Sequence, residues 1–379
     1  MFLPQLTYHP INWADGMKLT REHLSGNDQA QRDALRDMAG IFLNDFNYGL
    51  LPASAGIGSS VQLSFDGSEL ILSACRAITP GGVRIELHSG FMQPIRLGIT
   101  SLQSEMTSGR HKAFFVLAVA NPFERVPVGN PNPDEVPLRM PFTAPECRLA
   151  VATAEQLQQN PAGLYHVPVG KLTIENGIIT LSSVYIPPCV CLGSHPHLIE
   201  FYRRNGGRMG EVVNHAMAIV NKVKTNHRPG QVNQLSVDIG EIAEKIVTFI
   251  GDTLDSYRLI VNQMPPIYAV EYFVRFSRVM LTTLRCMPEQ QKEAVYNYFK
   301  NWCGISPVQM EAHISEVMEI EYQHADIATS LESVNKYMDF LAGLFSKLSQ
   351  LNYVEREKDE FFIPREEPAQ KGKGGFWGF

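Results

Sequence analysis

Two helical patterns between residues 197 and 263 constrain the fold of this chain more than any other feature of its sequence. In the first, apolar residues recur at steps of three and four: Met209, Val213, Ala216, Val220 and Val223. In the second, the same spacing is carried by Leu235, Ile239, Ile242, Ile246 and Phe249. Such alternation keeps one seam facing a partner along a left-handed bundle. Two helices cannot bury this much apolar surface alone, so the third partner comes either from the same chain, as an internal bundle, or from other copies, as a homo-oligomeric stalk.

The composition bounds the class of protein. A chain of 379 residues with 44% hydrophobic and 19% charged residues is typical of a folded protein with two or three domains. A net charge of −6 gives no general attraction for nucleic acid, and we expect no nucleic-acid partner. The start of the chain lacks a secretion signal, and the longest apolar run, 113–120, is too short to cross a bilayer. The six cysteines are scattered, which is typical of reduced thiols in the cytosol. We therefore expect a cytoplasmic protein, without direct membrane insertion.

Upstream of the helical patterns, the chain begins with a short extended piece and a turn at residues 12–17. A helix is predicted from about Arg21 to about Asp45. Its apolar residues suggest a buried face made of Leu24, Leu35, Met38, Ile41 and Phe42.

Residues 61–187 are typical of β structure, with short apolar runs separated by turns. Asp66-Gly67 and Asn176-Gly177 predict hairpin turns, and residues 114–119 predict a central strand. The pattern favours a β-sandwich. Residues 121–145 hold seven prolines, which exclude a central strand, so this segment is either a surface excursion or a partner-docking or trimer-contacting arm.

Downstream the chain is predicted to be helical to about residue 354. Ser306 and Gln309 around Pro307 form a capping-box signature, which is a strong helix start. A second seam follows the same spacing of three and four: Ile327, Leu331, Val334, Met338, Leu341, Phe345 and Leu348. The tail ends in Phe376, Trp377, Gly378 and Phe379, which we interpret as a docking peptide; the alternative is that these aromatics fill a core.

No motif typical of an enzyme is present. The sequence lacks a phosphate-binding loop with its lysine, a Gly-x-Ser-x-Gly elbow and an H-E-x-x-H pair. Four potential zinc ligands, Cys189, Cys191, His195 and His197, fall within nine residues. Their intervals are shorter than those of structural zinc sites, and the neighbouring prolines indicate an interdomain linker. We therefore expect no metal, no cofactor and no catalysis, although a dispersed active site is a third possibility.

Several segments together resemble the baseplate subunit TssK family of bacterial type VI secretion systems. The opening pattern is Trp13-Ala14-Asp15-Gly16-Met17, then Leu19 and His23. Further similar segments are Tyr48-Gly49-Leu50, Cys75 to Gly82, Val167 to Lys171, Tyr185 to Cys189 and Met264 to Tyr268. The resemblance covers roughly residues 11 to 290, and the order and spacing of the segments are more specific than any one of them.

The resemblance implies an α+β multidomain homotrimer. Residues 1–188 would be a β-sandwich shoulder similar to siphophage receptor-binding proteins, 189–287 a helical neck, 288–362 a helical head-like domain and 363–379 a flexible tail. Trp13, Gly16, Met17, Leu19 and His23 would then face the wedge proteins TssF and TssG, and Leu235, Ile239, Ile242, Ile246 and Phe249 would line the trimer. Phe376, Trp377 and Phe379 would serve C-terminal docking.

The C-terminal region departs from the family. The head of the family is larger and contains sheet, whereas residues 288–362 of this chain are predicted to be helical. Docking to the membrane-side proteins TssL and TssM would therefore use an altered contact or a divergent anchor. The resemblance implies a structural connector at the cytoplasmic face of the inner membrane. The alternative is an adaptor of the phage tail or receptor-binding type.

Overall fold

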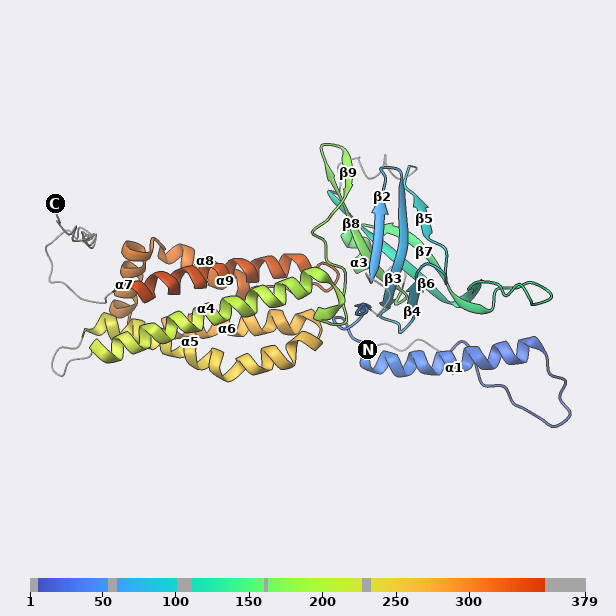
Figure 1. Cartoon of the computed structure of the whole chain (residues 1–379), viewed down its shortest axis with the longest axis horizontal. Coiled ribbons are helices and arrows are strands. Elements are labelled where there is room, and N and C mark those ends of the chain that lie inside the picture. Colours follow the sequence, from blue (N-terminus) through green and yellow to red (C-terminus); the bar gives the residue numbers. More distant parts are fainter. Residues whose placement is uncertain (1–5, 54–59, 101–110, 160–162, 227–232, 352–379) are drawn as a thin grey trace, which may run out of the picture.

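The computed structural model describes residues 6–53, 60–100, 111–159, 163–226 and 233–351. The molecule is elongated: strands β1 to β9 gather in one part, and helices α4 to α9 form a bundle along the long axis (Figure 1). Helix α1 lies beside the strands, and its C-terminal end is the one nearer the bundle (Figure 1). The combination of helices with antiparallel sheets confirms the predicted α+β class.

The first sheet is built around its longest strand, β3 (Glu69–Ile78). One edge of β3 pairs with β2 (Val61–Phe65) and β1 (Gly49–Leu50), and the other with β5 (Ile95–Gly98) and β4 (Arg84–Leu87), all antiparallel. The buried side chains of this sheet share one apolar core with those of the second sheet.

The second sheet has the order β7-β6-β8-β9. Its strands are β6 (Ala113–Val128), β7 (Phe142–Ala152), β8 (His166–Glu175) and β9 (Ile178–Leu181). Residues 114–119 lie between two neighbouring strands and are buried, which confirms the predicted central strand. A short helix, α3 (Ala154–Gln158), follows β7.

Both predicted hairpin turns are confirmed. β2 and β3 are joined across Asp66 and Gly67, and the glycine has a φ of 99°. β8 and β9 are joined across Asn176 and Gly177, with φ values of 52° and 79°. Two consecutive residues with positive φ suit a tight hairpin, and asparagine and glycine adopt that conformation most readily.

The proline-dense segment forms an arm in which β6 and β7 extend beyond the other strands (Figure 1). β8 pairs with β6 only as far as Val119, whereas β7 pairs with it to Val128. The segment 121–145 is therefore a surface arm whose two ends are strand. Pro122, Pro127 and Pro145 are tolerated there because each strand of the arm has one unpaired edge. A proline lacks the N–H, and on an unpaired edge this costs no hydrogen bond of the ladder.

Helix α1 (Arg21–Phe42) begins as predicted, with the Thr20 side chain accepting from the His23 N–H at 3.4 Å. Its orientation is opposite to the predicted one. The side chains predicted to be buried are 50–71% exposed, namely Leu24, Leu35, Met38, Ile41 and Phe42.

The face of α1 that contacts the rest of the chain combines small residues, such as the buried Ala30, with a charged pair. The buried carboxylate of Asp33 accepts from the backbone N–H groups of Thr7 and Tyr8 at 3.3 and 3.2 Å, and it pairs with Arg36. The Arg36 guanidinium lies 5.3 Å from the ring centre of Phe123 in β6. These charge-assisted contacts and the cation–π contact fix which side of the helix faces the sheet.

The bundle contains four long helices joined by shorter ones. The long helices are α4 (Pro196–Asn226), α5 (Gln234–Leu259), α6 (Pro266–Cys286) and α9 (Ile327–Gln350). The shorter ones are η2 (Val261–Gln263), α7 (Glu289–Tyr298), the π-helical turn η3 (Phe299–Cys303) and α8 (Pro307–Met318). Among the described helices, none combines the length and apolarity needed to cross a membrane.

The predicted features of the C-terminal helices are confirmed. Ser306 N–H donates to Gln309 Oε1 at 3.0 Å, and Gln309 N–H donates to Ser306 Oγ at 3.3 Å, which is the capping box. The seam of α9 is buried, with every member at most 4% exposed: Ile327, Leu331, Val334, Met338, Leu341, Phe345 and Leu348.

Helix α9 packs along α4, so the C-terminal residues complete the same bundle. Asn205 Nδ2 donates to Asn335 Oδ1 at 2.8 Å, and Lys222 Nζ donates to the Ser349 carbonyl at 2.8 Å. The predicted boundary between residues 287 and 288 therefore falls inside one helical bundle, which differs from a separate C-terminal domain.

The same packing changes the interpretation of the seam in α5. Ile239, Ile242 and Ile246 are 0–2% exposed within the single chain, and Leu235 and Phe249 are partly buried against the same core. The third partner that the sequence pattern requires is thus α6 and α9 of the same chain. The prediction of a trimer interface has to be corrected for the three isoleucines, because another copy cannot reach them while the bundle stays closed.

Candidate docking surfaces and interdomain junction

The residues predicted to face wedge proteins lie at the start of α1, at the end of this helix remote from the bundle (Figure 1). Trp13 and Leu19 are 47% and 63% exposed. Gly16 is exposed with a φ of 76°, in a turn that Met17 N–H closes on the Ala14 carbonyl. His23 is half-buried, and its ring lies edge-on to that of Trp13 at 6.3 Å. The turn and the ring contact hold two large apolar side chains toward solvent, an arrangement that suits docking better than chemistry.

A buried histidine joins the strand part to the bundle. His324, in the loop between α8 and α9, places Nε2 2.8 Å from the Tyr48 carbonyl and Nδ1 2.8 Å from the Tyr322 hydroxyl. A carbonyl only accepts, so Nε2 carries the proton and Nδ1 accepts from the tyrosine. Both nitrogens of the neutral ring are thereby satisfied. Burial lowers the pKa of His324 from 6.5 to about 4, although the Tyr48 carbonyl acts in the opposite direction.

Two further contacts reinforce this junction. Lys171 Nζ from β8 lies 2.5 Å from Asp326 Oδ2, and the buried Tyr185 hydroxyl donates to the Ala325 carbonyl at 2.7 Å. The four residues come from the second sheet, the linker and the loop before α9. Together with His324 they fix the bundle relative to the strands.

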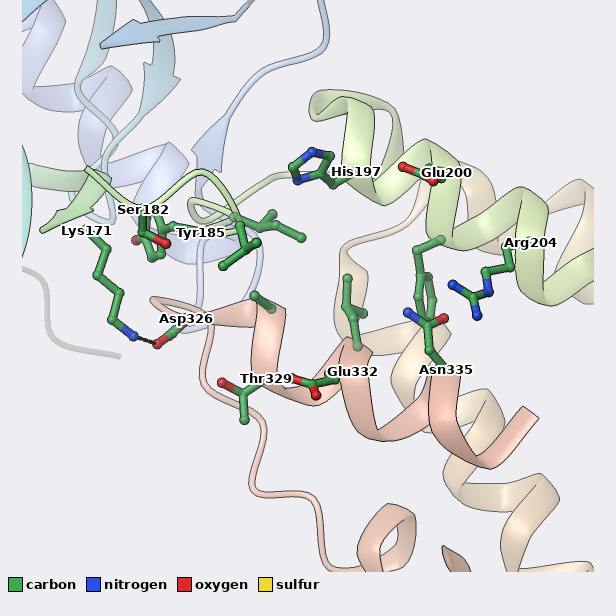
Figure 2. A pocket seen from close by; sticks show the side chains of 15 residues that line it. Lys171, Ser182, Tyr185, His197, Glu200, Arg204, Asp326, Thr329, Glu332 and Asn335 are labelled. Carbon is green, nitrogen blue, oxygen red and sulfur yellow. Dashed lines mark hydrogen bonds and ion pairs between the residues drawn. The ribbon is translucent and has the colours of Figure 1, made fainter. Parts of the chain in front are cut away.

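These contacts border a cleft of about 470 Å³ between the two parts of the molecule (Figure 2). Its labelled lining residues come from β8, the linker, α4 and the start of α9: Lys171, Ser182, Tyr185, His197, Glu200, Arg204, Asp326, Thr329, Glu332 and Asn335. The cations among them are already paired, since Lys171 binds Asp326 and Arg204 binds Asp339 at 2.5 Å. Lys171 and Asp326 thus hold the junction, while Arg204 joins α4 to α9 within the bundle.

The linker before α4 contains the four potential metal ligands, and the structure disperses them. Cys189 is fully buried, its thiol lies 3.2 Å from the Pro187 carbonyl, and burial raises its pKa well above the ordinary value. Cys191 contacts Ser194 at 3.5 Å, while the rings of His195 and His197 lie 5.1 Å apart. Within the part of the chain that the structure describes, no three such side chains could hold a metal ion together.

The backbone of this linker is joined to both parts of the molecule. Leu50 N–H in β1 donates to the Pro188 carbonyl at 2.7 Å, and Val190 N–H donates to the Leu50 carbonyl at 3.1 Å. Leu192 N–H donates to the Met264 carbonyl, just before α6, at 3.1 Å. The interdomain linker is therefore part of a stiff joint.

Sequence reasoning did not identify the junction residues, because they come from distant segments and carry no local motif. Tyr48, Lys171 and Tyr185 lie in segments that resemble the TssK family, but nothing in the sequence indicates that they share a site with Tyr322 and His324. Phe376, Trp377 and Phe379, predicted as a docking peptide, lie outside the described residues.

The buried His324 predicts a stability that depends on pH. Its folded-state pKa of about 4 lies below the ordinary 6.5, so between these values the unfolded chain binds more protons than the folded one. The stabilisation is complete above about pH 6.5 and is lost as the pH falls toward 4, by up to about 3 kcal/mol.

Thermal unfolding from pH 7.5 to 4.5 checks this expectation, with His324→Gln as the matched variant. The variant should be less stable at neutral pH but lose less stability on acidification. A slope that is equally steep in both proteins would contradict the assignment to His324. Part of the slope should persist, because burial also lowers the pKa of His166 and of His195, the latter to about 4.

The described structure resembles known TssK structures. Comparison with protein-family models and with curated protein sequences finds no match. A crystal structure of TssK is similar over 92% of this chain and 75% of its own, with 15% identity and a TM-score of 0.51. A chain of the baseplate complex from the type VI secretion system is similar over 88% of this chain and 100% of its own, with 13% identity and the same TM-score. The chain thus has a divergent TssK-like fold, which confirms the resemblance seen in the sequence at the level of the fold.

Proposed function

We propose that this chain is a structural component of a type VI secretion baseplate. In this role a homotrimer connects the wedge proteins TssF and TssG to a membrane-side anchor, TssL and TssM or a divergent equivalent. It acts at the cytoplasmic face of the inner membrane and catalyses no reaction.

The observation that carries this proposal is the extent of the fold similarity. A likeness that spans 88% of this chain and the whole of a baseplate-complex chain includes both the strand part and the bundle. In the proposed assignment, the two sheets form the shoulder and α4, α5 and α6 form the neck. Helix α9 packs into the neck, and only the far end of the bundle corresponds to a head.

The exposed start of α1 supports the wedge-facing assignment. Trp13 and Leu19 extend a broad apolar surface into solvent, and large apolar side chains held by a turn are typical of interface anchors. Gly16, Met17 and His23 shape the turn behind them. On this proposal the opposite end of the molecule, where α9 ends (Figure 1), faces the anchor, and Phe376, Trp377 and Phe379 serve the docking to it.

A stiff joint between the two parts supports a connector. A protein that links two larger assemblies must hold their relative orientation, and the junction at His324, Lys171 and Tyr185 restricts hinge motion. The paired charges in the adjoining cleft favour this structural role over catalysis.

Binding to wedge proteins tests the proposal. We expect the full chain to co-purify with TssF and TssG encoded by the same gene cluster. The double variant Trp13→Ala, Leu19→Ala should weaken that binding at least about 30-fold, because truncating two central anchors costs about 2 kcal/mol or more. Surface plasmon resonance or calorimetry measures the change.

The matched control is Val184→Ala, which truncates a side chain that is 70% exposed in the linker, away from α1. This variant should bind as tightly as the wild type. Failure of the wild-type chain to bind either wedge protein would reject the proposed function. Equal binding by the double variant would reject only the assignment of the surface.

A further inference from the structure

A groove runs between α4 and α5, toward the end of the bundle that is remote from the strands (Figure 1). Its volume is about 670 Å³, within the range of about 300–1,000 Å³ that is typical of pockets for drug-sized ligands. Val220 and Val223 from α4 and Val237 from α5 supply its apolar surface, and each is only partly buried. Gly240 also lines the groove, where a Cβ would lie 3.0 Å from Val223 Cγ1. The absence of a side chain at Gly240 therefore leaves Val223 uncovered.

The rim of the groove carries charged side chains. Lys224 Nζ from α4 and Glu244 Oε1 from α5 pair across it at 3.2 Å. Glu241 and Lys245, one turn apart on α5, are exposed, and within the described part of the chain neither forms a salt bridge. A carboxylate attracts a cation, and an ammonium group lies favourably over the face of an aromatic ring. A ligand that suits this groove therefore combines aromatic rings with positive charge.

The last residues of the sequence have this composition. Within 371–379, two lysines precede three aromatic residues, and no acidic residue is present: Lys371, Lys373, Phe376, Trp377 and Phe379. The tail has one other apolar cluster, 361–363, but the six residues before it hold four acidic and two basic side chains. That cluster would bring net negative charge toward Glu241. Charge thus favours the segment 371–379 as the occupant of the groove.

The described chain ends on the helix that forms one wall of the groove. The carbonyls of Ser349 and Leu351, at the end of α9, accept from Lys222 Nζ of α4 at 2.8 and 2.9 Å. A helix is about 10–12 Å across with its side chains, whereas residues 352–370 span about 60 Å when extended. The segment 371–379 therefore reaches the groove of its own chain. Tethering gives it an effective concentration of about 1 mM there, far above that of another copy at micromolar protein.

We propose that the segment 371–379 docks in the groove between α4 and α5 of the same chain. Its aromatic rings pack on the three valines, and its lysines face Glu241. This contact goes beyond the proposed function, because it needs no other protein. In a secretion baseplate, an anchor that takes up the same aromatic residues would have to displace them from the groove.

Disulfide trapping in the full chain tests the proposal. In a Cys286→Ser background, which removes the exposed cysteine, Thr248→Cys in the groove should pair with Gly378→Cys on mild oxidation. Peptide mapping identifies the bond, and a non-reducing gel shows whether it lies within one chain. The matched control is Val308→Cys, at a residue 77% exposed on α8. It should pair with Gly378→Cys at least about tenfold more slowly, because only docking raises the local concentration of the tail at Thr248.

The rate of trapping also shows whether the aromatic residues carry the contact. The double variant Trp377→Ala, Phe379→Ala should slow the trapping at least about tenfold, because large aromatic anchors dominate contacts of this kind. The double variant Phe361→Ala, Phe362→Ala truncates two aromatic side chains earlier in the tail and should leave the rate unchanged. All four residues lie outside the described fold, so circular dichroism and the melting temperature should match those of the parent protein in both variants.

A charge exchange tests the role of Glu241. Glu241→Lys, at an exposed residue, should slow the trapping about fivefold, because it replaces an attraction for the lysines of the tail by a repulsion. Adding Lys371→Glu and Lys373→Glu to that variant should restore the rate. A purely structural effect of the substitution in α5 would not be reversed by changes in the tail.

Three results would overturn the proposal. They are equal trapping rates for Thr248→Cys and Val308→Cys, trapping that the loss of Trp377 and Phe379 does not slow, and a disulfide that joins two copies instead of two sites in one chain. The last result would assign the groove to the tail of another copy. Each of them leaves binding to TssF and TssG untouched, so failure of this inference is distinguishable from failure of the proposed function.

Discussion

Replacing Phe273 by alanine is expected to lower the free energy of unfolding by about 3–5 kcal/mol. Phe273 is fully buried in α6. The centre of its ring lies 6.0, 5.8 and 5.3 Å from the ring centres of Phe201, Tyr257 and Tyr272. Truncation removes apolar area, leaves a cavity among rigid rings and deletes edge-to-face contacts. Because domains are stable by only about 5–15 kcal/mol, the bundle should become marginal.

Urea unfolding followed by circular dichroism, at fixed protein concentration, measures this loss. The matched control is Phe142→Ala, which makes the same truncation at a side chain 60% exposed on the arm and should cost less than about 1 kcal/mol. A comparable, small cost for both variants would mean that the rings around Phe273 do not form a closed core.

The parts of the fold that the sequence predicted depend on local interactions. The Asn176-Gly177 turn follows from the φ values that these two residue types accept. The capping box at Ser306 follows from side chains three residues apart, and the seam of α9 follows from helical periodicity. In each case the residues that determine the structure are neighbours in the chain, so a single sequence contains the information.

The orientation of α1 shows what periodicity leaves open. Spacing predicts which residues share a face, but not which face contacts the protein. For α1 the outcome is set by the buried Asp33 and by Arg36 above Phe123, contacts that span 25 or more residues. The helix therefore buries charged side chains that have specific partners and leaves its apolar side exposed. A surface helix usually does the opposite, with its apolar face buried and its polar face exposed.

The same limit applies to the candidate sites. Trp13 and Leu19 were identified by resemblance, and the structure adds that they are exposed. The periodicity of α5 predicts a seam that needs a third partner, but it does not distinguish a helix of the same chain from one of another copy. His324 was missed because its partner Tyr48 is 276 residues away.

The joint between the two parts of the molecule also depends on one backbone position. Gly49 in β1 has a φ of 111°, and a Cβ at this residue would lie 2.1 Å from the Pro188 carbonyl oxygen. Only glycine allows β1 to approach the linker closely enough for Leu50 N–H to bind that carbonyl at 2.7 Å. The clash involves backbone on both sides, so no rotamer change can relieve it.

Gly49→Ala is therefore expected to lower the free energy of unfolding by about 4 kcal/mol, from strain at positive φ and from loss of the hydrogen bonds of Leu50 and Val190. Gly67→Ala is the matched control, because Gly67 also has positive φ, 99°, but a Cβ there would meet nothing within 4 Å. The control should cost only about 1 kcal/mol, so the difference between the variants isolates the contact with the linker.

Hydrogen exchange should show faster exchange at the amides of Leu50 and Val190 in Gly49→Ala alone. Equal costs for the two variants, with the amides of Leu50 and Val190 still protected, would contradict this expectation. That result would mean that the contact between β1 and the linker does not stabilise the joint. The stiff connection required by the proposed connector would then have to come from other contacts.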